Sequence, residues 1–361
     1  MLWAMDELPK KQKAVIGLED GSLTVSNDVG IAQIGEHMVL IRTRAIGLNP
    51  IDTKMKGPLA APGAIAGIDF AGEVVALGAH AKTPAKIEVG DRVFGAATGY
   101  QRPKPTLGAF AEFVAIDSAG LMKIPDNWTF EQAASAGCSI STIGLALFKS
   151  LNVPGTPKCP AEKPVNVFVY GGSTTTGTMA IQLLKMSGLN PITVCSPQNF
   201  ELAKSYGATA VFDYKQPSCI EDIRKYTKNS LKYVIDCVSE PETMEFCYKC
   251  LGRTGGKYSA LEPYAEVLHT RSRTVVPDWV LGPSVLGEEI TWPEPFTRQQ
   301  NEELRNFGTD WFVTAQKLLD QDQLRPHPVR VVKGGLDGVR EGLELLRKKQ
   351  VSGQKLVCSL A

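Results

Sequence analysis

The pattern of hydrophobic and polar positions changes character near the middle of the chain. Before residue 120 the apolar runs are short and bounded by glycine, proline or aspartate, as in Met38–Ala45, Gly72–Leu77 and Ala109–Ile116. Runs of this length and setting are typical of strands. Thr129 then opens a helical stretch as an N-cap residue. The pattern predicts a β-rich N-terminal region followed by a helix.

From residue 165 onward, strand-like runs alternate with helical ones. The segment Asn152–Pro164, with its four prolines, predicts a loop at a domain junction. Alternating β and α units predict a parallel sheet with helices on both faces. The proline- and tryptophan-containing stretch Pro277–Gln300 predicts a long loop, either a binding loop or a surface insertion. The expected strands are 165–170, 191–195, 211–212, 233–238, 257–261, 329–333 and 355–358, and the expected helices are 177–187, 199–205, 241–251, 302–319 and 336–348.

Composition narrows the classes of protein. The 361 residues carry a formal net charge of +1, which argues against a nucleic-acid binder or a polybasic membrane-surface protein. No apolar run reaches the roughly 18 residues needed to span a membrane. The first residues lack the pattern of a signal peptide. We expect a two-domain, soluble cytoplasmic protein whose eight scattered cysteines are reduced thiols.

The segment Val165–Gly177 carries the clearest chemical signal. A buried strand ends at Tyr170 and leads through Gly171-Gly-Ser-Thr-Thr-Thr-Gly177 into a helix. A helix N-terminus presents free N–H groups to a pyrophosphate, and glycine lets the backbone approach it. Thr174 stands where a central glycine is usual, but it adds a hydroxyl donor. The segment predicts a dinucleotide site; the alternative is a polar turn in a non-binding α/β domain.

The end of the second strand of this domain favours NADPH over NADH. An NAD site usually has an acidic residue there, which binds the ribose 2′-hydroxyl. Here the sequence is Cys195-Ser-Pro-Gln-Asn199, without an acid to repel a 2′-phosphate. Ser196 and Asn199 can donate hydrogen bonds to that phosphate. Tyr214, after the third strand, either contacts the same group or is a packing aromatic.

The cysteines and histidines do not predict a zinc site. The first 137 residues contain no cysteine, whereas zinc alcohol dehydrogenases need cysteine and histidine ligands. The C-x-x-C pair Cys247 and Cys250 lies in a predicted helix without a partner pair. We therefore expect no metal.

Several motifs resemble those of a known superfamily. They are Gly47–Lys54, Gly67–Val74, Val89–Gly95, Gly108–Phe113 and the glycine turn. Together they resemble the zinc-independent medium-chain dehydrogenase/reductases over nearly the whole chain. Asn49–Met55, Tyr170–Thr174, Ile140–Leu145, Cys195–Phe200, Asp236-Cys237 and Asp278–Pro283 are similar to the fungal trans-acting enoyl reductases of the lovastatin type.

The resemblance implies a fold and a domain order. It implies an α/β protein in which a β-rich GroES-like catalytic domain is built from both ends of the chain, and a Rossmann domain with a doubly wound parallel sheet is inserted between them. The implied boundaries are 1–151 and 325–361 for the catalytic domain, 165–324 for the NADP-binding domain and 152–164 for the connecting loop.

The resemblance also implies an activity. A trans-acting enoyl reductase uses NADPH to reduce an α,β-unsaturated thioester held on the acyl carrier domain of a partner polyketide synthase or synthase–peptide synthetase hybrid, in secondary metabolism. One alternative is a quinone or enone reductase acting on free small molecules. The other is a non-catalytic NADPH-binding structural or regulatory protein.

Site residues follow from the matching positions. Lys54 is the expected cation at the reaction centre and Thr142 its hydrogen-bonding companion; the alternatives are a solvated surface lysine and a helix-start hydroxyl. No residue stands out as the proton donor. The expected cofactor contacts are Ile51, Asp52, Thr53, Lys54, Ser173, Thr174, Thr175, Thr176, Ser196, Pro197, Gln198, Asn199, Tyr214, Leu261, Glu262, Val351 and Ser352. The expected substrate contacts, which as apolar residues could equally be core, are Ile143, Gly144, Leu145, Ala146, Leu147, Phe148, Lys149, Ser150, Gly282, Pro283, Ser284, Val285 and Leu286.

The predicted oligomeric state is a monomer. Many relatives dimerise at the edge of the Rossmann sheet, just after its fifth strand. Here the proline-rich Pro277–Gln300 segment follows that strand. Proline lacks the N–H group that edge pairing uses.

Overall fold

A computed structural model describes residues 8–264, 271 and 273–360. The chain divides into two compact units, Met1–Ser141 with Pro283–Ala361, and Thr142–Gly282. The first unit thus combines both ends of the chain. The boundaries differ from the expected ones, because the chain crosses between units at residues 141 and 282. Helix α7 (Glu302–Asp320) therefore belongs to the first unit.

The second unit is built on a six-stranded parallel sheet in the order β10-β9-β8-β11-β12-β13. The chain winds outward from β8 in one direction and then, from β11, in the other. Ligands of such sheets bind beyond the carboxyl ends of the strands at this reversal. The strands are β8 (Asn166–Tyr170), β9 (Asn190–Cys195), β10 (Ala210–Asp213), β11 (Tyr233–Asp236), β12 (Gly256–Ala260) and β13 (Val275–Trp279).

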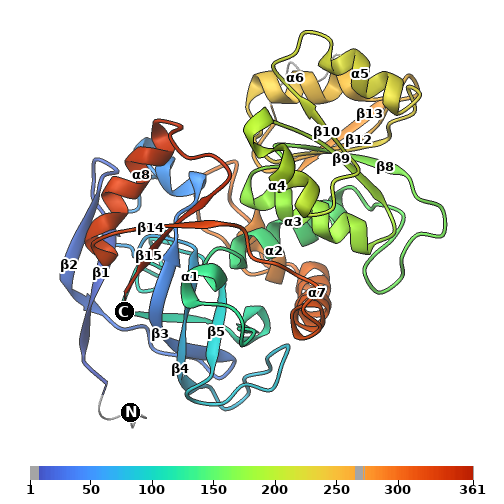
Figure 1. Ribbon diagram of the computed structural model, residues 1–361. Coiled ribbons are helices and arrows are strands. Elements are labelled where there is room, and N and C mark those ends of the chain that lie inside the picture. Colours follow the sequence, from blue (N-terminus) through green and yellow to red (C-terminus); the bar gives the residue numbers. More distant parts are fainter. Residues whose placement is uncertain (1–7, 265–270, 272, 361) are drawn as a thin grey trace. The chain divides into compact units, whose positions relative to one another are not determined.

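Helices cover both faces of this sheet. Figure 1 shows α5 (Cys219–Tyr226) and α6 (Pro241–Cys250) on one face, and α3 (Thr175–Met186) and α4 (Phe200–Ser205) on the other. One core cluster joins strand residues such as Phe168 and Val234 to Ile223 of α5 and Cys247 of α6. The unit begins in α2 (Gly137–Gly144), which continues as a π-helical segment, η5 (Leu145–Ser150).

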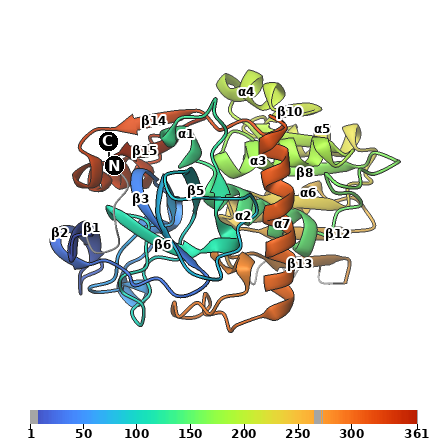
Figure 2. The same ribbon diagram turned by 90° about the horizontal axis from the view of Figure 1, so that it is seen from below.

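The first unit contains a seven-stranded sheet in the order β14-β15-β3-β4-β5-β7, with β6 also paired to β3. Figure 2 shows the C-terminal β15 between β14 and the N-terminal β3. The strands are β3 (Met38–Gly47), β4 (Asp69–Leu77), β5 (Arg92–Ala96), β6 (Phe113–Asp117), β7 (Met122–Lys123), β14 (Val329–Val332) and β15 (Lys355–Ser359), beside the separate hairpin of β1 (Lys11–Gly17) and β2 (Leu23–Gly30).

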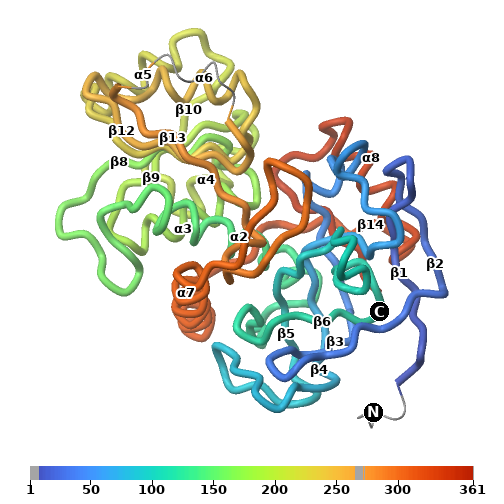
Figure 3. Tube along the Cα trace, turned by 180° about the vertical axis from the view of Figure 1, so that it is seen from behind, coloured from blue at the N-terminus to red at the C-terminus, as the bar shows by residue number. Residues whose placement is uncertain are grey.

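Short helices join the strands of this unit. Thr129 caps α1 (Phe130–Ala133), as its position predicted: its hydroxyl accepts the Gln132 N–H. Near the C-terminus, α8 (Val339–Arg347) packs on η2 (Pro50–Thr53), and Figure 3 shows it beside the N-terminal strands of the same unit. The other short 3-10 helices of this unit include η3 (Gly57–Leu59), η4 (Ser118–Gly120) and η9 (Gly335–Gly338), and η8 (Gly282–Leu286) lies where the chain re-enters it. Helix η6 (Pro197–Asn199) belongs to the second unit.

A buried ion pair ties the two ends of the chain together in the first unit. The ammonium of Lys355 in β15 lies 2.9 Å from Oδ2 of Asp69 in β4, and both side chains are buried. Asp69 also accepts hydrogen bonds from the side-chain amide of Asn49, at 2.9 Å, and from the backbone N–H of Cys138, at 2.6 Å. Lys355 donates to Asn49 as well. The end of β3, the start of β4, α2 and β15 therefore converge on one carboxylate.

One predicted segment needs correction, and two structural features were not predicted. Pro277–Gln300 is not one loop: residues 277–279 belong to the edge strand β13, and η8 lies within it. Helix α5 and the hairpin β1–β2 were missed. Helix α5 is amphipathic but follows a polar turn, and β2 has a mostly polar sequence that resembles a loop.

Two further features of the fold are the state of its cysteines and the character of its helices. All eight cysteines are free thiols, and Cys195, Cys219, Cys247, Cys250 and Cys358 are buried. Within the described ranges, no helix combines the length and the apolar character that a bilayer crossing requires.

Replacing Lys355 by methionine should destabilise the protein by roughly 3–5 kcal/mol, because Asp69 would keep a buried charge without its cation. Urea denaturation at pH 7 measures this loss. Lys86→Met serves as the control, since Lys86 pairs with Glu88 on the exposed surface, where such pairs contribute little. A loss for Lys355→Met no greater than that of the control would contradict the role of the pair.

Candidate active site

The turn after β8 is built for close approach to its ligand. Gly171 has a φ of 82°, which glycine adopts without strain. A Cβ on Gly172 would lie 2.1 Å from the hydroxyl of Thr193, and one on Gly177 would lie 2.2 Å from the carbonyl oxygen of Gly171. Both positions therefore require glycine, and the turn packs directly against the neighbouring strand.

Thr174 fixes the start of α3. Its hydroxyl accepts the backbone N–H of Gly177 at 2.9 Å and donates to the carbonyl of Gly171 at 2.8 Å. The threonine that replaces the usual glycine is thus the N-cap of the helix. Ser173, Thr175 and Thr176 adjoin it at the end of the helix that attracts anions.

Cys237, which lies beside this turn, adds no negative charge to it. The thiol sits against the hydroxyls of Thr174 and Thr176, and burial raises its pKa to about 12. A neutral thiol does not repel a pyrophosphate. The next carboxyl group, Asp236 at the end of β11, is buried, and burial raises its pKa from the ordinary value.

The ends of β9 and β10 meet beside this turn. The hydroxyl groups of Ser196 and Tyr214 lie 3.3 Å apart, and the rings of Tyr214 and Tyr170 are 6.2 Å apart. Tyr214 is partly exposed, so its ring is available on one side. Pro197, Gln198 and Asn199 form the short helix η6 that follows Ser196.

Sequence reasoning missed one cation at this corner. The ammonium of Lys215 lies 6.0 Å from the centre of the Tyr214 ring. Lys204, in α4, forms an ion pair with Glu201 at 2.8 Å. Lys215 directly follows Tyr214 in the chain, and this position was the available signal.

Asp236 organises the loops that follow β11 and β12. Its carboxylate accepts the backbone N–H groups of Val238 and Ser239, both at 2.9 Å. Ser239 donates to the Asp236 carbonyl and accepts the N–H of Leu261 at 2.8 Å. Leu261 and Glu262 therefore lie at the same carboxyl edge of the sheet as the turn after β8 and the Ser196 corner.

Thr142 is the first residue of the second unit, and its side chain is closely packed. Its side chain is buried, and a Cβ on Gly282 would lie 2.1 Å from its hydroxyl oxygen. Gly282 therefore makes room for Thr142. Of the expected substrate contacts in this unit, Ile143 to Leu147 are buried, and Ser150 donates to the hydroxyl of Ser259 at 2.9 Å.

The first unit positions Ile51, Thr53 and Lys54 through Asp52. The Asp52 carboxylate accepts the Asn49 N–H at 2.7 Å and the Tyr100 hydroxyl at 2.9 Å. Burial raises the pKa of Asp52 to about 7, although these donors and Lys355 favour the charged form. Asp52 therefore serves as an internal anchor and Lys54, the residue after η2, is exposed.

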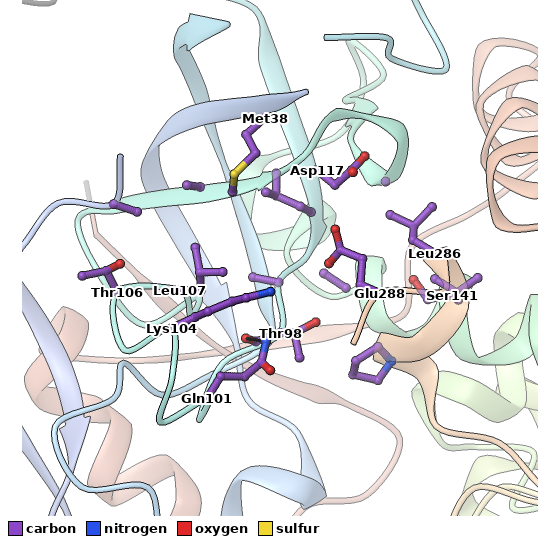
Figure 4. Close-up of a pocket in the computed structure, with 18 of the residues that line it drawn as sticks. Met38, Thr98, Gln101, Lys104, Thr106, Leu107, Asp117, Ser141, Leu286 and Glu288 are labelled. Carbon is purple, nitrogen blue, oxygen red and sulfur yellow. Dashed lines mark hydrogen bonds between the residues drawn. The ribbon is translucent and has the colours of Figure 1, made fainter. Parts of the chain in front are cut away.

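Val351 and Ser352 lie in the same unit, between α8 and β15. Helix α8, which precedes them, packs on η2, the helix that precedes Lys54. In the first unit, Pro283, Val285 and Leu286 line a cavity of about 390 Å³, together with Ser141 and Phe312 (Figure 4). Ser284 is buried.

The residues therefore fall into two groups. The second unit brings Ser173–Thr176, Ser196–Asn199, Tyr214, Leu261 and Glu262 to one sheet edge, and their cradle of glycines and hydroxyls fits a dinucleotide. The first unit holds Lys54 and the cavity. Within the described residues, no group of three or more histidine, cysteine, aspartate or glutamate side chains could hold a metal ion.

Comparison with known proteins matches both units. The alcohol dehydrogenase GroES-like domain matches residues 35–126, and the zinc-binding dehydrogenase domain matches residues 175–260. Among solved structures, an alcohol dehydrogenase superfamily protein from Novosphingobium aromaticivorans has a TM-score of 0.75 at 20% identity, covering 97% of this chain and 100% of that chain. The CurK enoyl reductase has a TM-score of 0.72 at 18% identity, covering 97% and 98%. These likenesses show the fold.

Curated relatives are far more similar in sequence. Trans-enoyl reductase eqxC of Fusarium heterosporum is 51% identical over 97% of this chain and 99% of its own length. Trans-enoyl reductase FSL5 of Gibberella zeae is 56% identical over 98% of each chain. With its two matched domains and these relatives, the protein is an oxidoreductase that binds a nicotinamide dinucleotide. The chain belongs to the fungal trans-enoyl reductases of the medium-chain dehydrogenase/reductase superfamily.

Proposed function

We propose that the protein is an NADPH-dependent enoyl reductase that acts in trans. Its substrate would be an α,β-unsaturated thioester on the acyl carrier domain of a polyketide synthase or a synthase–peptide synthetase hybrid. The observation that carries the proposal is the 56% identity to trans-enoyl reductase FSL5 along the whole chain. The sheet-edge cradle in the second unit and the exposed Lys54 in the first supply the chemistry that such a reaction needs.

The cofactor, when bound, supplies a hydride to the β-carbon of the alkene. The chain's own residues then have two tasks. Ser173 to Thr176 and the N-terminus of α3 bind the pyrophosphate and fix the position of the cofactor. Lys54 donates a hydrogen bond to the thioester oxygen, where negative charge develops as the β-carbon gains its hydride. A proton from water completes the product at the α-carbon.

Asp52 and its hydrogen-bond partners fix the backbone from which the Lys54 side chain extends. The segment 49–54 is held by the Asn49 N–H and the Tyr100 hydroxyl from inside the fold. The buried anchor leaves only the lysine side chain to adjust to a bound thioester. Pre-organised cations of this kind stabilise a transition state more than the ground state.

The residues that follow β9 and β10 favour NADPH over NADH. Ser196 and Tyr214 present two hydroxyl groups 3.3 Å apart, and Lys215 adds a positive charge beside the ring. No acidic residue occupies positions 195–199, so a 2′-phosphate meets donors and no repelling carboxylate there.

The first experiment measures NADPH oxidation with crotonyl-pantetheine and with free quinones. We expect reduction of the thioester and little reaction with quinones. Lys54→Met should lower kcat by about 100-fold, because it removes a cation from the developing charge. Lys56→Met, two residues away and also exposed, is the matched control and should retain activity. Turnover of free quinones without turnover of the thioester would refute the proposal.

The cofactor preference is tested by Ser196→Asp. The new carboxylate would repel the 2′-phosphate, so we expect the KM for NADPH to rise roughly 10- to 100-fold and that for NADH to change little. Ser196→Ala removes the hydroxyl without adding charge and should have a much smaller effect. Equal changes in both KM values would show that β9 does not contact the 2′-position.

We also propose that the protein is a monomer. The edge strand β13 carries Pro277 at its centre, which cannot donate a hydrogen bond to a second copy. Val276 beside it is 64% exposed. Sedimentation velocity at micromolar concentration should give a single species of about 39.0 kDa. A stable dimer would show that another surface, or this edge despite its proline, mediates association.

A further inference from the structure

Tyr100 has an unusual backbone conformation for a buried aromatic residue. Its φ is 59°, in the left-handed region that large side chains rarely adopt. Its side chain is 3% exposed, and its hydroxyl donates to Oδ1 of Asp52 at 2.9 Å. Backbone strain of this kind persists only where the surrounding structure holds the residue, and it is common at functional sites. A functional role for the Tyr100 hydroxyl would explain why the chain keeps this strain.

The segment 290–298 holds Tyr100 in this conformation. Its first and last residues exchange backbone hydrogen bonds at 2.9 Å, so the segment closes on itself. The Trp292 ring lies edge-on to the Tyr100 ring, with 6.5 Å between the ring centres, and the indole N–H donates to the Gly99 carbonyl at 2.9 Å. The Gln101 side chain accepts a backbone N–H of the segment at 3.2 Å. Both chain neighbours of Tyr100 are therefore bonded to one segment of the same unit.

The Asp52 carboxylate closes the turn that leads to Lys54. Its Oδ2 accepts the backbone N–H of Asn49 at 2.7 Å, and the Asp52 N–H donates to the Asn49 carbonyl at 3.1 Å. The Lys54 N–H donates to the Ile51 carbonyl at 2.9 Å, so the lysine follows this turn directly. An ionised carboxylate accepts hydrogen bonds at both oxygens, whereas a protonated one carries a hydroxyl at one of them. Protonation of Asp52 would therefore disturb the bond from either Asn49 or Tyr100.

Opposing effects set the charge of Asp52. Burial raises its pKa to about 7. The Asn49 N–H, the Tyr100 hydroxyl and the positive charge of Lys355 favour the ionised form. The negative charge of Asp69 disfavours it. Because Asn49 donates from its main chain and Lys355 is paired with Asp69, the Tyr100 hydroxyl is the donor that a substitution removes most cleanly.

Helix α8 packs on η2 and brings further charge toward Tyr100. Burial, and then the charge of Asp52, raise the pKa of Tyr100 well above the ordinary tyrosine value, although Arg347 at the end of α8 opposes them. The other charged residues of α8 are exposed, namely Arg340, Glu341 and Glu344. Tyr100 therefore keeps its proton and remains a hydrogen-bond donor at every pH at which the enzyme would be assayed.

We propose that Tyr100 is a positioning residue for Lys54: its hydroxyl holds Asp52 as an ionised acceptor, and Asp52 holds the turn from which Lys54 extends. This inference rests on the proposed function, in which Lys54 acts on the thioester. It adds a pH dependence to that function, because turnover should fall as Asp52 gains a proton. The segment 290–298 takes part through Tyr100, although it is far from Lys54 in the sequence.

The pH profile of turnover tests the proposal. For crotonyl-pantetheine, kcat of the wild type should be half-maximal near pH 7 and fall on the acid side. Tyr100→Phe removes a donor to the carboxylate, so the midpoint should rise to about 8, while kcat at alkaline pH stays within about threefold of the wild type. Asp52→Asn has no carboxylate to titrate and should lack the acid limb. Tyr226→Phe, at an exposed tyrosine of α5, is the matched control and should keep the wild-type midpoint.

Carbon-13 NMR measures the same group without turnover. In protein labelled at the aspartate carboxyl carbons, the signal that is missing from Asp52→Asn should titrate near pH 7 and move to higher pH in Tyr100→Phe. If that variant folds poorly, Trp292→Phe keeps a ring beside Tyr100 but loses the bond to the Gly99 carbonyl, and it should move the midpoint in the same direction by less. The methyl signal of dimethylated Lys54, identified by its absence from Lys54→Met, should shift with the Asp52 midpoint.

The outcomes separate the two proposals. An Asp52 signal that titrates below about pH 5, as an ordinary aspartate does, would overturn the inference. The same holds for an unchanged midpoint in folded Tyr100→Phe, for an acid limb that persists in Asp52→Asn, and for a Lys54 signal that does not follow Asp52. Absence of turnover with every thioester would refute the proposed function alone, and the two NMR titrations would then decide whether Tyr100 positions the lysine.

Discussion

The carboxylate of Asp69 is the point on which the first unit depends. A charge this deeply buried is tolerated only when it is paired and hydrogen-bonded. Lys355, Asn49 and the Cys138 N–H supply those partners from three separate parts of the chain. Satisfying one charged group therefore fixes β15 beside β3 and sets where the segment 49–54 leaves the sheet. The position of Lys54 therefore follows from a charge that is buried inside the fold.

The two units use different physical means to prepare a site. In the second unit the constraint is steric: Gly172 and Gly177 let main chain and side chains approach at distances that exclude a Cβ. In the first unit the constraint is electrostatic, with buried carboxylates surrounded by donors. The steric cradle suits a cofactor whose shape does not vary. The electrostatic anchor holds the backbone from which the exposed Lys54 side chain extends.

Much of this architecture could be predicted from the sequence, because it is local. The run Val165–Tyr170 before a glycine turn predicts both a buried strand and a phosphate-binding helix, and Thr129 predicts its own helix cap. What could not be predicted depends on distant pairing. Lys355 looks like any polar residue at the start of a strand, and only the folded sheet brings it to Asp69, which is 286 residues away. Pro277 suggested a loop because proline does not fit a central strand. In the structure it lies in β13, an edge strand, where proline is accepted.

The two-part construction of the first unit has a consequence for biosynthesis. Asp69 and Lys355 are separated by 286 residues, and the second unit lies between them. At about 5–20 residues per second, roughly 15–60 s pass on the ribosome between the synthesis of the carboxylate and that of its cation. During that interval the second unit can complete its own parallel sheet, whereas the first waits with β3 lacking one neighbour. The nucleotide-binding half would then be folded before the half that carries Lys54 is closed.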